Sequence, residues 1–281
     1  MSQGLQIGST SHDATNRSKS VMRELFDEVA GHSPLDPQEA ARRGARAPQR
    51  KRLYAKVGVI EAEGGLAITL DGRPIRTPSG RVIIAPSRSI AEMIAAEWDA
   101  QKETIDPLTM PMTRFANSVV EAVVDRVDDV TADIAKYLSS DLLFYRAGHP
   151  EALVTCESAH WDPLLFWAAE ALGAHFILGQ GIVHVRQPDA AIAAARAALP
   201  TDPWMVAAMH VVTALTGSAL LALALLHGVR EPDQVWAAAH VEEDFNAEQW
   251  GWDEEAAARR AARLIDFQAA SRILNALKSA G

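Results

Sequence analysis

Cysteine is almost absent from this 281-residue chain, which contains only Cys156. A single thiol cannot form a disulfide framework or a multi-cysteine zinc or iron–sulfur site. Aromatic residues are also scarce, at 6% of the chain. The formal net charge of −9 provides no positive surplus to neutralise phosphate groups, so we expect no nucleic-acid partner.

The sequence motifs of several enzyme classes are missing as well. The chain has neither the GxxxxGKS/T nor the GxGxxG pattern of phosphate-binding loops, and Gly217–Ser218 is not part of a GxSxG nucleophile motif. We therefore expect no cofactor. The lack of a catalytic constellation favours a binding function over a chemical one.

One long run without acidic residues, lysine or arginine, residues 205–227, could reach across a bilayer. Alanine dominates this run, which also contains several polar residues. Asp202–Pro203 before it and Gly228 after it are typical of the ends of a helix in a globular protein. We expect residues 203–227 to form a buried helix in a helical domain, with no membrane insertion.

Strand patterns come early in the chain and helix patterns later. Residues 54–60 are apolar and β-branched, and Asp71–Gly72 is a strong hairpin signal after the alternating residues 66–70. Ser89 and Glu92 form a predicted capping box for the helix that follows. The predicted fold is α+β, with a small antiparallel β-rich N-terminal domain followed by an all-helical C-terminal domain.

We expect three segments along the chain. They are a flexible polar and basic N-terminal segment (1–52), a β-rich domain (53–110) to whose sheet a strand in 175–185 is a candidate addition, and a helical domain (111–281). The last helices are predicted over 189–199, 203–227, 232–249 and 253–278, because apolar residues recur there at helical spacing.

Charge is distributed unevenly, since Glu231 to Glu255 contains nine acidic residues and no lysine or arginine. On a helix over 232–249, Trp236, His240, Glu243 and Trp250 would share one stripe. Aromatic anchors beside acids are typical of a recognition face. The alternative is that the tryptophans pack internally while the acids are merely solvated, and the sequence leaves both open.

A second interpretation concerns His240, Glu243 and Asp244. On a helix these residues stand at positions i, i+3 and i+4, where their side chains could share one metal ion. This set is the basis of an alternative function, a metal-dependent hydrolase.

Short motifs that run in order through residues 55–255 point to a known family. They are Asp71-Gly72-Arg73-Pro74, Glu97-Trp98, Met110-Pro111, Leu138-Ser139-Ser140-Asp141-Leu142-Leu143, Trp161-Asp162-Pro163-Leu164, Glu242-Glu243 and Gln249-Trp250-Gly251. Together they resemble the assembly chaperone for the alpha subunit of F1-ATPase, which occurs in mitochondria and bacteria.

The resemblance implies a chaperone without enzymatic activity that shields the unassembled F1-ATPase alpha subunit without ATP hydrolysis. It places a functionally important acid at Glu242 or Glu243, and the predicted stripe favours Glu243. The expected partner-binding residues are Trp236, Glu242, Glu243, Asp244 and Trp250. The motif residues expected to determine the fold are Asp71, Gly72, Pro74, Trp98 and Pro111.

We expect the protein to be a monomer. Because no transit peptide is evident in the sequence, we expect it in the cytoplasm of a bacterium, or in the mitochondrial matrix if its source is eukaryotic. A basic stretch, residues 42–56, contains seven lysines and arginines, and its role is left open.

Overall fold

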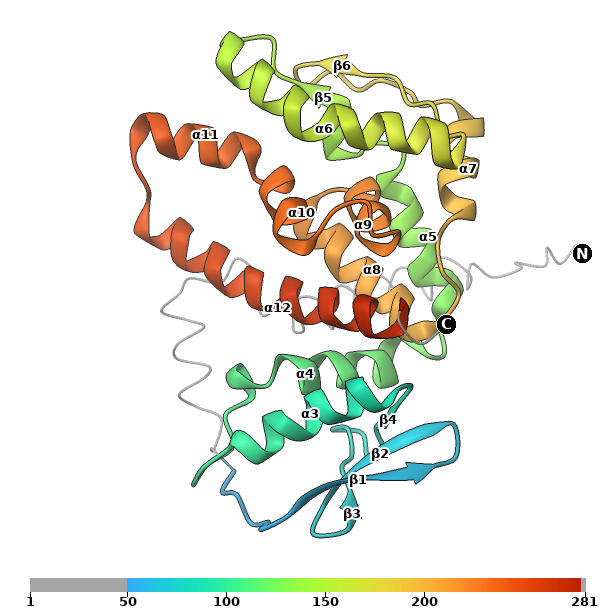
Figure 1. Ribbon diagram of the computed structural model, residues 1–281, viewed down its shortest axis with the longest axis vertical. Helices are drawn as coiled ribbons and strands as arrows, with labels where there is room; N and C mark the ends of the chain where they lie inside the picture. The colour runs from blue at the N-terminus through green and yellow to red at the C-terminus, as the bar shows by residue number, and fades with distance from the viewer. Residues whose placement is uncertain (1–49, 279–281) are drawn as a thin grey trace, which may run out of the picture. The chain divides into compact units, whose positions relative to one another are not determined.

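An antiparallel sheet begins the part of the chain that the computed structural model describes, residues 50–278 (Figure 1). The central strand β2 pairs with each of the other three strands, and Val57 of β1 lies opposite Leu70 of β2. The strands are β1 (Val57–Ala62), β2 (Gly65–Leu70), β3 (Arg73–Pro74) and β4 (Ile84–Ala85).

The predicted hairpin at Asp71–Gly72 is confirmed. Asp71 has a φ of 49° and Gly72 a φ of 79°, and such left-handed pairs form the tight turns that match the twist of a hairpin. The Asp71 carboxylate also accepts the backbone N–H groups of Ala55 and Lys56, at 3.1 Å and 2.8 Å. The turn therefore holds the chain that leads into β1.

Helix α3 (Arg88–Ala100) packs on the sheet through Ile90 and Ile94, which are fully buried together with Ile68 of β2. The predicted N-cap of this helix, Ser89, is wrong, because the cap lies two residues earlier. The Ser87 hydroxyl caps the helix by accepting the backbone N–H of Ile90 at 3.4 Å.

Helices make up most of the rest of the described chain, which confirms the predicted fold class. They are the 3-10 helix η1 (Pro107–Thr109), α4 (Pro111–Ser118), the π-helical segment η2 (Val119–Val123), α5 (Val127–Tyr137), the 3-10 helix η3 (Leu142–Phe144), α6 (Glu151–Leu172), α7 (Asp189–Ala197), α8 (Pro203–Thr216), α9 (Ala219–Leu226), α10 (Pro232–Ala239), α11 (Val241–Trp250) and α12 (Glu254–Lys278).

The core of the helical part lies around α8 and α9. Every residue of α9 is buried, and the long helix α12 packs along α8 and α9 while also contacting α4 (Figure 1). The prediction of a single helix over 203–227 is wrong, because Gly217 ends α8 with a φ of 70° and Ser218 caps α9. Within residues 50–278, none of the helices combines the length and the apolar character that a membrane crossing requires.

The candidate strand in 175–185 does not join the N-terminal sheet. Strand β6 (Gly179–Gln180) instead pairs in parallel with β5 (Tyr145–Arg146). Aromatic stacking explains this position, since the Phe176 ring lies 4.6 Å from the ring of Phe144, just before β5. The side chain of Gln187 closes the loop by bonding to both the N–H and the C=O of Ile177 at 2.8 Å.

Of the predicted N-terminal segment 1–52, the structure describes only the last residues. The N–H of Arg52 donates to the Glu103 carbonyl at 2.9 Å, and the N–H of Ile105 donates to the Arg50 carbonyl at 2.8 Å. Most of the basic stretch 42–56 lies outside the described residues, and the predicted domain boundary at residue 110 stays a prediction.

Candidate partner-binding site

The helix predicted over 232–249 is interrupted at His240, which separates α10 from α11. The His240 side chain is buried, its Nδ1 donates to the carbonyl of Trp236 at 2.7 Å, and its ring lies 4.1 Å from the Trp236 ring. Burial lowers the pKa of His240 and so favours the neutral imidazole. Because the axis changes at this residue, the predicted single stripe does not form.

The two tryptophans of that predicted stripe have different environments. Trp236 is only 7% exposed and packs 5.0 Å from the Phe267 ring of α12, so it belongs to the core. Trp250, at the end of α11, is 86% exposed. Only Trp250 offers its side chain to a partner.

Three consecutive acids begin α11, where the positive end of the helix dipole stabilises negative charge. The Asp244 carboxylate is paired with Arg260 of α12, including an Nη2–Oδ2 contact of 3.0 Å. This pairing raises the pKa of Arg260, whose guanidinium also lies over the Trp252 ring, 5.5 Å from its centroid. Asp244 therefore ties α11 to α12.

Glu242 lies beside a fully buried carboxyl group, that of Glu157 on α6. The Glu157 Oε2 accepts the backbone N–H of Ala147 at 2.9 Å, whereas its Oε1 has no hydrogen-bond partner among residues 50–278. Burial raises the pKa of Glu157, and the charge of Glu242 raises it further. The charged form of Glu157 is therefore disfavoured at this position.

Glu243 is exposed and has no direct ion pair with a lysine or arginine among residues 50–278. Its side chain is 60% exposed, the Nε2 of His240 lies 4.0 Å from its carboxylate, and its charge also acts on Arg260. A neutral imidazole at that distance does not neutralise the charge. Glu243 therefore presents an available carboxylate to the solvent.

Helix α11 turns into α12 through a short connection (Figure 1). Two exposed tryptophans lie at this turn. Trp250 and Trp252, the latter 60% exposed, flank Gly251, whose φ of 90° allows the reversal. More acids follow at the start of α12. We define the α11–α12 tip as Glu243, Glu248, Trp250, Trp252, Asp253 and Glu254, all of which are exposed. Large aromatic side chains surrounded by charge are typical of a protein-recognition surface.

The predicted metal site does not form. Asp244 points to Arg260, while His240 is buried against Trp236. No three His, Cys, Asp or Glu side chains in the described part of the chain lie close enough together to hold a metal ion. The structure thus provides no ligand set for the hydrolase alternative.

The motif residues of the N-terminal part lie away from this tip. Asp71, Gly72 and Pro74 form the β2–β3 turn and strand β3, while the Trp98 ring packs edge-on against Tyr54 at 5.9 Å. Pro111 is the first residue of α4, and a carboxylate of α3 accepts backbone N–H groups of that first turn. The Glu97 carboxylate accepts the N–H groups of the next two residues of α4 at 2.6 Å and 2.7 Å.

Sequence reasoning missed Glu157 and Arg260, the two residues that give the acids of α11 their different roles. They approach α11 from α6 and α12, and neither belongs to a recognisable pattern around residue 242. Glu157 is an ordinary acid within an apolar helix, and Arg260 is one of several basic residues of α12. Only their tertiary positions show their importance.

Known proteins resemble this chain over most of its length. The family model described as ATP12 chaperone protein matches residues 51–169. The mitochondrial protein atp12 of Schizosaccharomyces pombe is 22% identical over 222 residues, which cover 74% of this chain and 76% of that protein.

Solved structures match more closely. A crystal structure of a protein from Agrobacterium tumefaciens has 45% identity and a TM-score of 0.80, and the match covers 95% of this chain and 100% of that one. Atp12 from Paracoccus denitrificans has 40% identity and a TM-score of 0.77, with 80% of this chain and 97% of that chain covered. With 40% identity over nearly the whole of a solved Atp12, the chain belongs to the ATP12 chaperone family.

Proposed function

We propose that this protein, a chaperone of ATP synthase assembly by its family, binds the unassembled alpha subunit of F1-ATPase and prevents its aggregation without hydrolysing ATP. The observation that carries the proposal is the α11–α12 tip, where exposed tryptophans stand among acids that form no ion pair with a lysine or arginine of residues 50–278. We further propose that the chaperone works as a monomer in the bacterial cytoplasm. Its relative in Schizosaccharomyces pombe is mitochondrial.

An isolated subunit of a hetero-oligomer exposes apolar surfaces that its neighbours normally cover, and such surfaces aggregate. A temporary binder must cover them and later dissociate. A partly polar interface suits that task better than a large apolar one, because affinity is adjusted mainly through the rate of dissociation. The tip combines two large aromatic side chains with charged groups, which water can solvate again when the client dissociates.

The acids of α11 have separate roles in this proposal. Glu243 contacts the client, because its carboxylate is exposed and forms no direct ion pair with a lysine or arginine among the described residues. Asp244 positions α11 through Arg260, and Trp250 supplies apolar contact area. Glu242 contributes less, since its carboxyl lies beside Glu157. Trp236 supports the site from the core.

The decisive experiment dilutes purified F1 alpha subunit from denaturant and follows light scattering with and without this protein, in the absence of ATP. The F1 beta subunit serves as the control client. We expect near-stoichiometric suppression of aggregation for alpha and none for beta. Equal protection of both would identify a general holdase, and no protection of either would refute the proposed function.

Single charge reversals locate the client face. Glu243→Lys should abolish protection of alpha while the melting temperature stays within about 2 °C, because an exposed residue contributes little to stability. Glu63→Lys, in the exposed turn between β1 and β2, makes the same change of charge away from the tip and should protect normally. Loss of protection in both variants would assign the effect to net charge, and a large fall in the melting temperature of Glu243→Lys would make that residue structural.

A further inference from the structure

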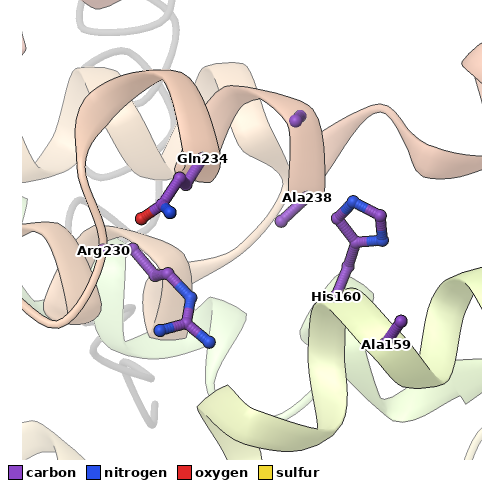
Figure 2. A pocket seen from close by; sticks show the side chains of 6 residues that line it. Ala159, His160, Arg230, Gln234 and Ala238 are labelled. Atoms are coloured by element: carbon purple, nitrogen blue, oxygen red, sulfur yellow. The ribbon is translucent and has the colours of Figure 1, made fainter.

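A pocket of about 420 Å³ lies between α6 and α10 with the residue Arg230 just before it, a region that the proposed client face does not include. Its walls carry three polar and three small side chains (Figure 2). They are Ala159 and His160 from α6, and Arg230, Gln234, Ala237 and Ala238 from the opposite side.

Arg230 is a half-buried cation without a carboxylate partner among residues 50–278. Its one hydrogen bond there runs from Nη1 to the carbonyl of the preceding residue, Val229, at 3.1 Å. Two other arginines with little exposure pair with carboxylates, Arg114 with Asp266 and Arg146 with Asp162. Most of the donors of the Arg230 guanidinium are therefore available at the pocket wall.

Gln234 and His160 present polar atoms from the two sides of the same space (Figure 2). The Gln234 Oε1 accepts the backbone N–H of Glu231 at 3.1 Å, which leaves its Nε2 donor without a described partner. The His160 Nδ1 donates to the carbonyl of Cys156 at 2.9 Å, so its proton is on that nitrogen. The Nε2 of the same ring faces the α10 side.

We infer that this pocket binds the carboxylate side chain of an acidic residue on the client polypeptide. A guanidinium fork recognises a carboxylate through two parallel hydrogen bonds, and the Gln234 amide supplies a further donor. The three alanines leave room for the methylene groups of the bound side chain. This inference rests on the proposed function, because it specifies how the client is held.

A phosphate group suits the pocket less well. The N-terminus of α10 is already capped by its own Glu231 and Gln234 side chains, so it offers no free ring of backbone N–H groups. Glu231 and Asp233 also lie next to Arg230 in the chain and reduce the local positive potential. One guanidinium neutralises the single charge of a carboxylate but not the two charges of a phosphate.

The position of the pocket fits a client that also contacts α11. His160 follows Glu157 by one helical turn of α6, and Glu157 is the residue beside Glu242. A client segment can therefore place an acidic side chain in the pocket while neighbouring basic or apolar groups approach the acids of α11.

The test titrates the full-length, ¹⁵N-labelled protein with a capped five-residue peptide that carries one central glutamate among alanines. A twin peptide with glutamine in its place is the control probe. We expect saturable shifts of the Gln234 side-chain amide and the Arg230 Nε–H signals, with at least tenfold weaker binding of the glutamine peptide. Equal binding of the two peptides, or tighter binding of inorganic phosphate, would overturn the inference.

Variants tie the signal to the pocket. Arg230→Gln should reduce binding of the glutamate peptide at least tenfold, whereas Arg272→Gln, on an exposed part of α12, should leave it unchanged. Gln234→Glu provides an independent check if Arg230→Gln folds poorly. This variant retains the acceptor for the Glu231 N–H and places its own carboxylate next to Arg230. That carboxylate should pair with the guanidinium and so prevent binding of the glutamate peptide. Unchanged binding in both pocket variants contradicts the assignment.

The client assay separates this inference from the proposed function. If the wild-type protein protects F1 alpha, Arg230→Gln should require several-fold more chaperone for half-maximal suppression of scattering. If the wild-type protein does not protect alpha, the proposed function fails, and the peptide titration still decides whether the pocket binds carboxylates. Protection by the wild type without peptide binding refutes the pocket alone.

Discussion

Replacing Asp141 with asparagine should destabilise the protein by about 1–3 kcal/mol at acidic pH, and this difference should vanish or reverse at neutral pH. Asp141 is completely buried, and its carboxyl joins the starts of two helices. Its Oδ1 accepts the N–H of Leu143 in η3 at 3.2 Å, and its Oδ2 accepts the N–H of Leu220 in α9 at 3.1 Å. An asparagine provides only one of these two acceptors.

The size of the effect follows from two opposing contributions. Loss of an acceptor for a buried N–H costs about 1–3 kcal/mol at any pH. Burial raises the pKa of Asp141 from 3.8 to about 6, although the Ser218 hydroxyl and the backbone donors favour the charged form. A rise of about two pH units corresponds to about 3 kcal/mol, the approximate free energy that the wild type loses when Asp141 ionises in the folded state.

The raised pKa of Asp141 determines the direction in which the free energy of unfolding changes with pH. Between about pH 4 and pH 6 the folded protein holds a proton on Asp141 that the unfolded chain has released, so its free energy of unfolding decreases as the pH rises. The asparagine variant has no such group. The stability difference between wild type and Asp141→Asn should be fully present below pH 4 and should shrink by up to about 3 kcal/mol as the pH rises to 7.

Urea unfolding followed by far-UV circular dichroism at half-unit steps from pH 4 to 7.5 measures this difference, with reversibility checked at each pH. All other ionisable groups are common to the two proteins and largely cancel. Asp141→Ala is the control, since neither variant titrates at this position and their mutual difference should not change with pH. A gap between wild type and Asp141→Asn that widens with pH would refute the reasoning, because the hydrogen bonds would then outweigh desolvation and lower the pKa of Asp141.

Three further substitutions, one of them with a matched control, test other interactions by the same unfolding assay. Arg114→Gln breaks a 2.5 Å ion pair between α4 and α12 and should lower the free energy of unfolding by about 2–4 kcal/mol. Its control is Arg88→Gln, whose exposed ion pair spans 4.0 Å and whose loss should cost less than about 0.5 kcal/mol. Similar losses in the two variants would contradict the role of burial. Trp161→Phe removes the donor of a buried 2.7 Å bond to the Ala238 carbonyl and should cost about 1–3 kcal/mol, and a neutral result would exclude this bond as a link between α6 and α10. Because burial raises the pKa of Glu157, wild type should lose stability relative to Glu157→Gln as the pH rises through that pKa, and the opposite slope would show that the carboxylate is stabilised in place.

Local chemistry explains why much of the fold could be predicted. The Asp71–Gly72 turn depends on two residues that tolerate positive φ, and the N-terminus of α8 depends on a capping aspartate followed by proline. Gly217–Ser218 carried a comparable signal, since glycine commonly ends helices and serine commonly begins them. The prediction of one helix over 203–227 gave more weight to the apolar run than to this pair.

The break at His240 has no comparable local signal. Neither glycine nor proline occurs between Gln234 and Glu248, and the residues there favour a continuous helix. The interruption depends on the burial of the His240 ring against Trp236, which in turn packs on Phe267 of α12. The sequence alone could not show that contact, and the predicted stripe failed with it.

The acids of α11 show how far composition can predict a site. They belong to the stretch Glu231–Glu255, whose nine acids without a lysine or arginine indicate a negatively charged surface, because they cannot all be neutralised locally. Their individual tasks are set by elements that meet only in the folded chain, since α6 brings a carboxyl to Glu242 and α12 brings a guanidinium to Asp244. Glu243 is exposed, and its charge acts on Arg260 without a direct ion pair between them, so a client cation can contact its carboxylate without displacing an existing lysine or arginine partner among residues 50–278.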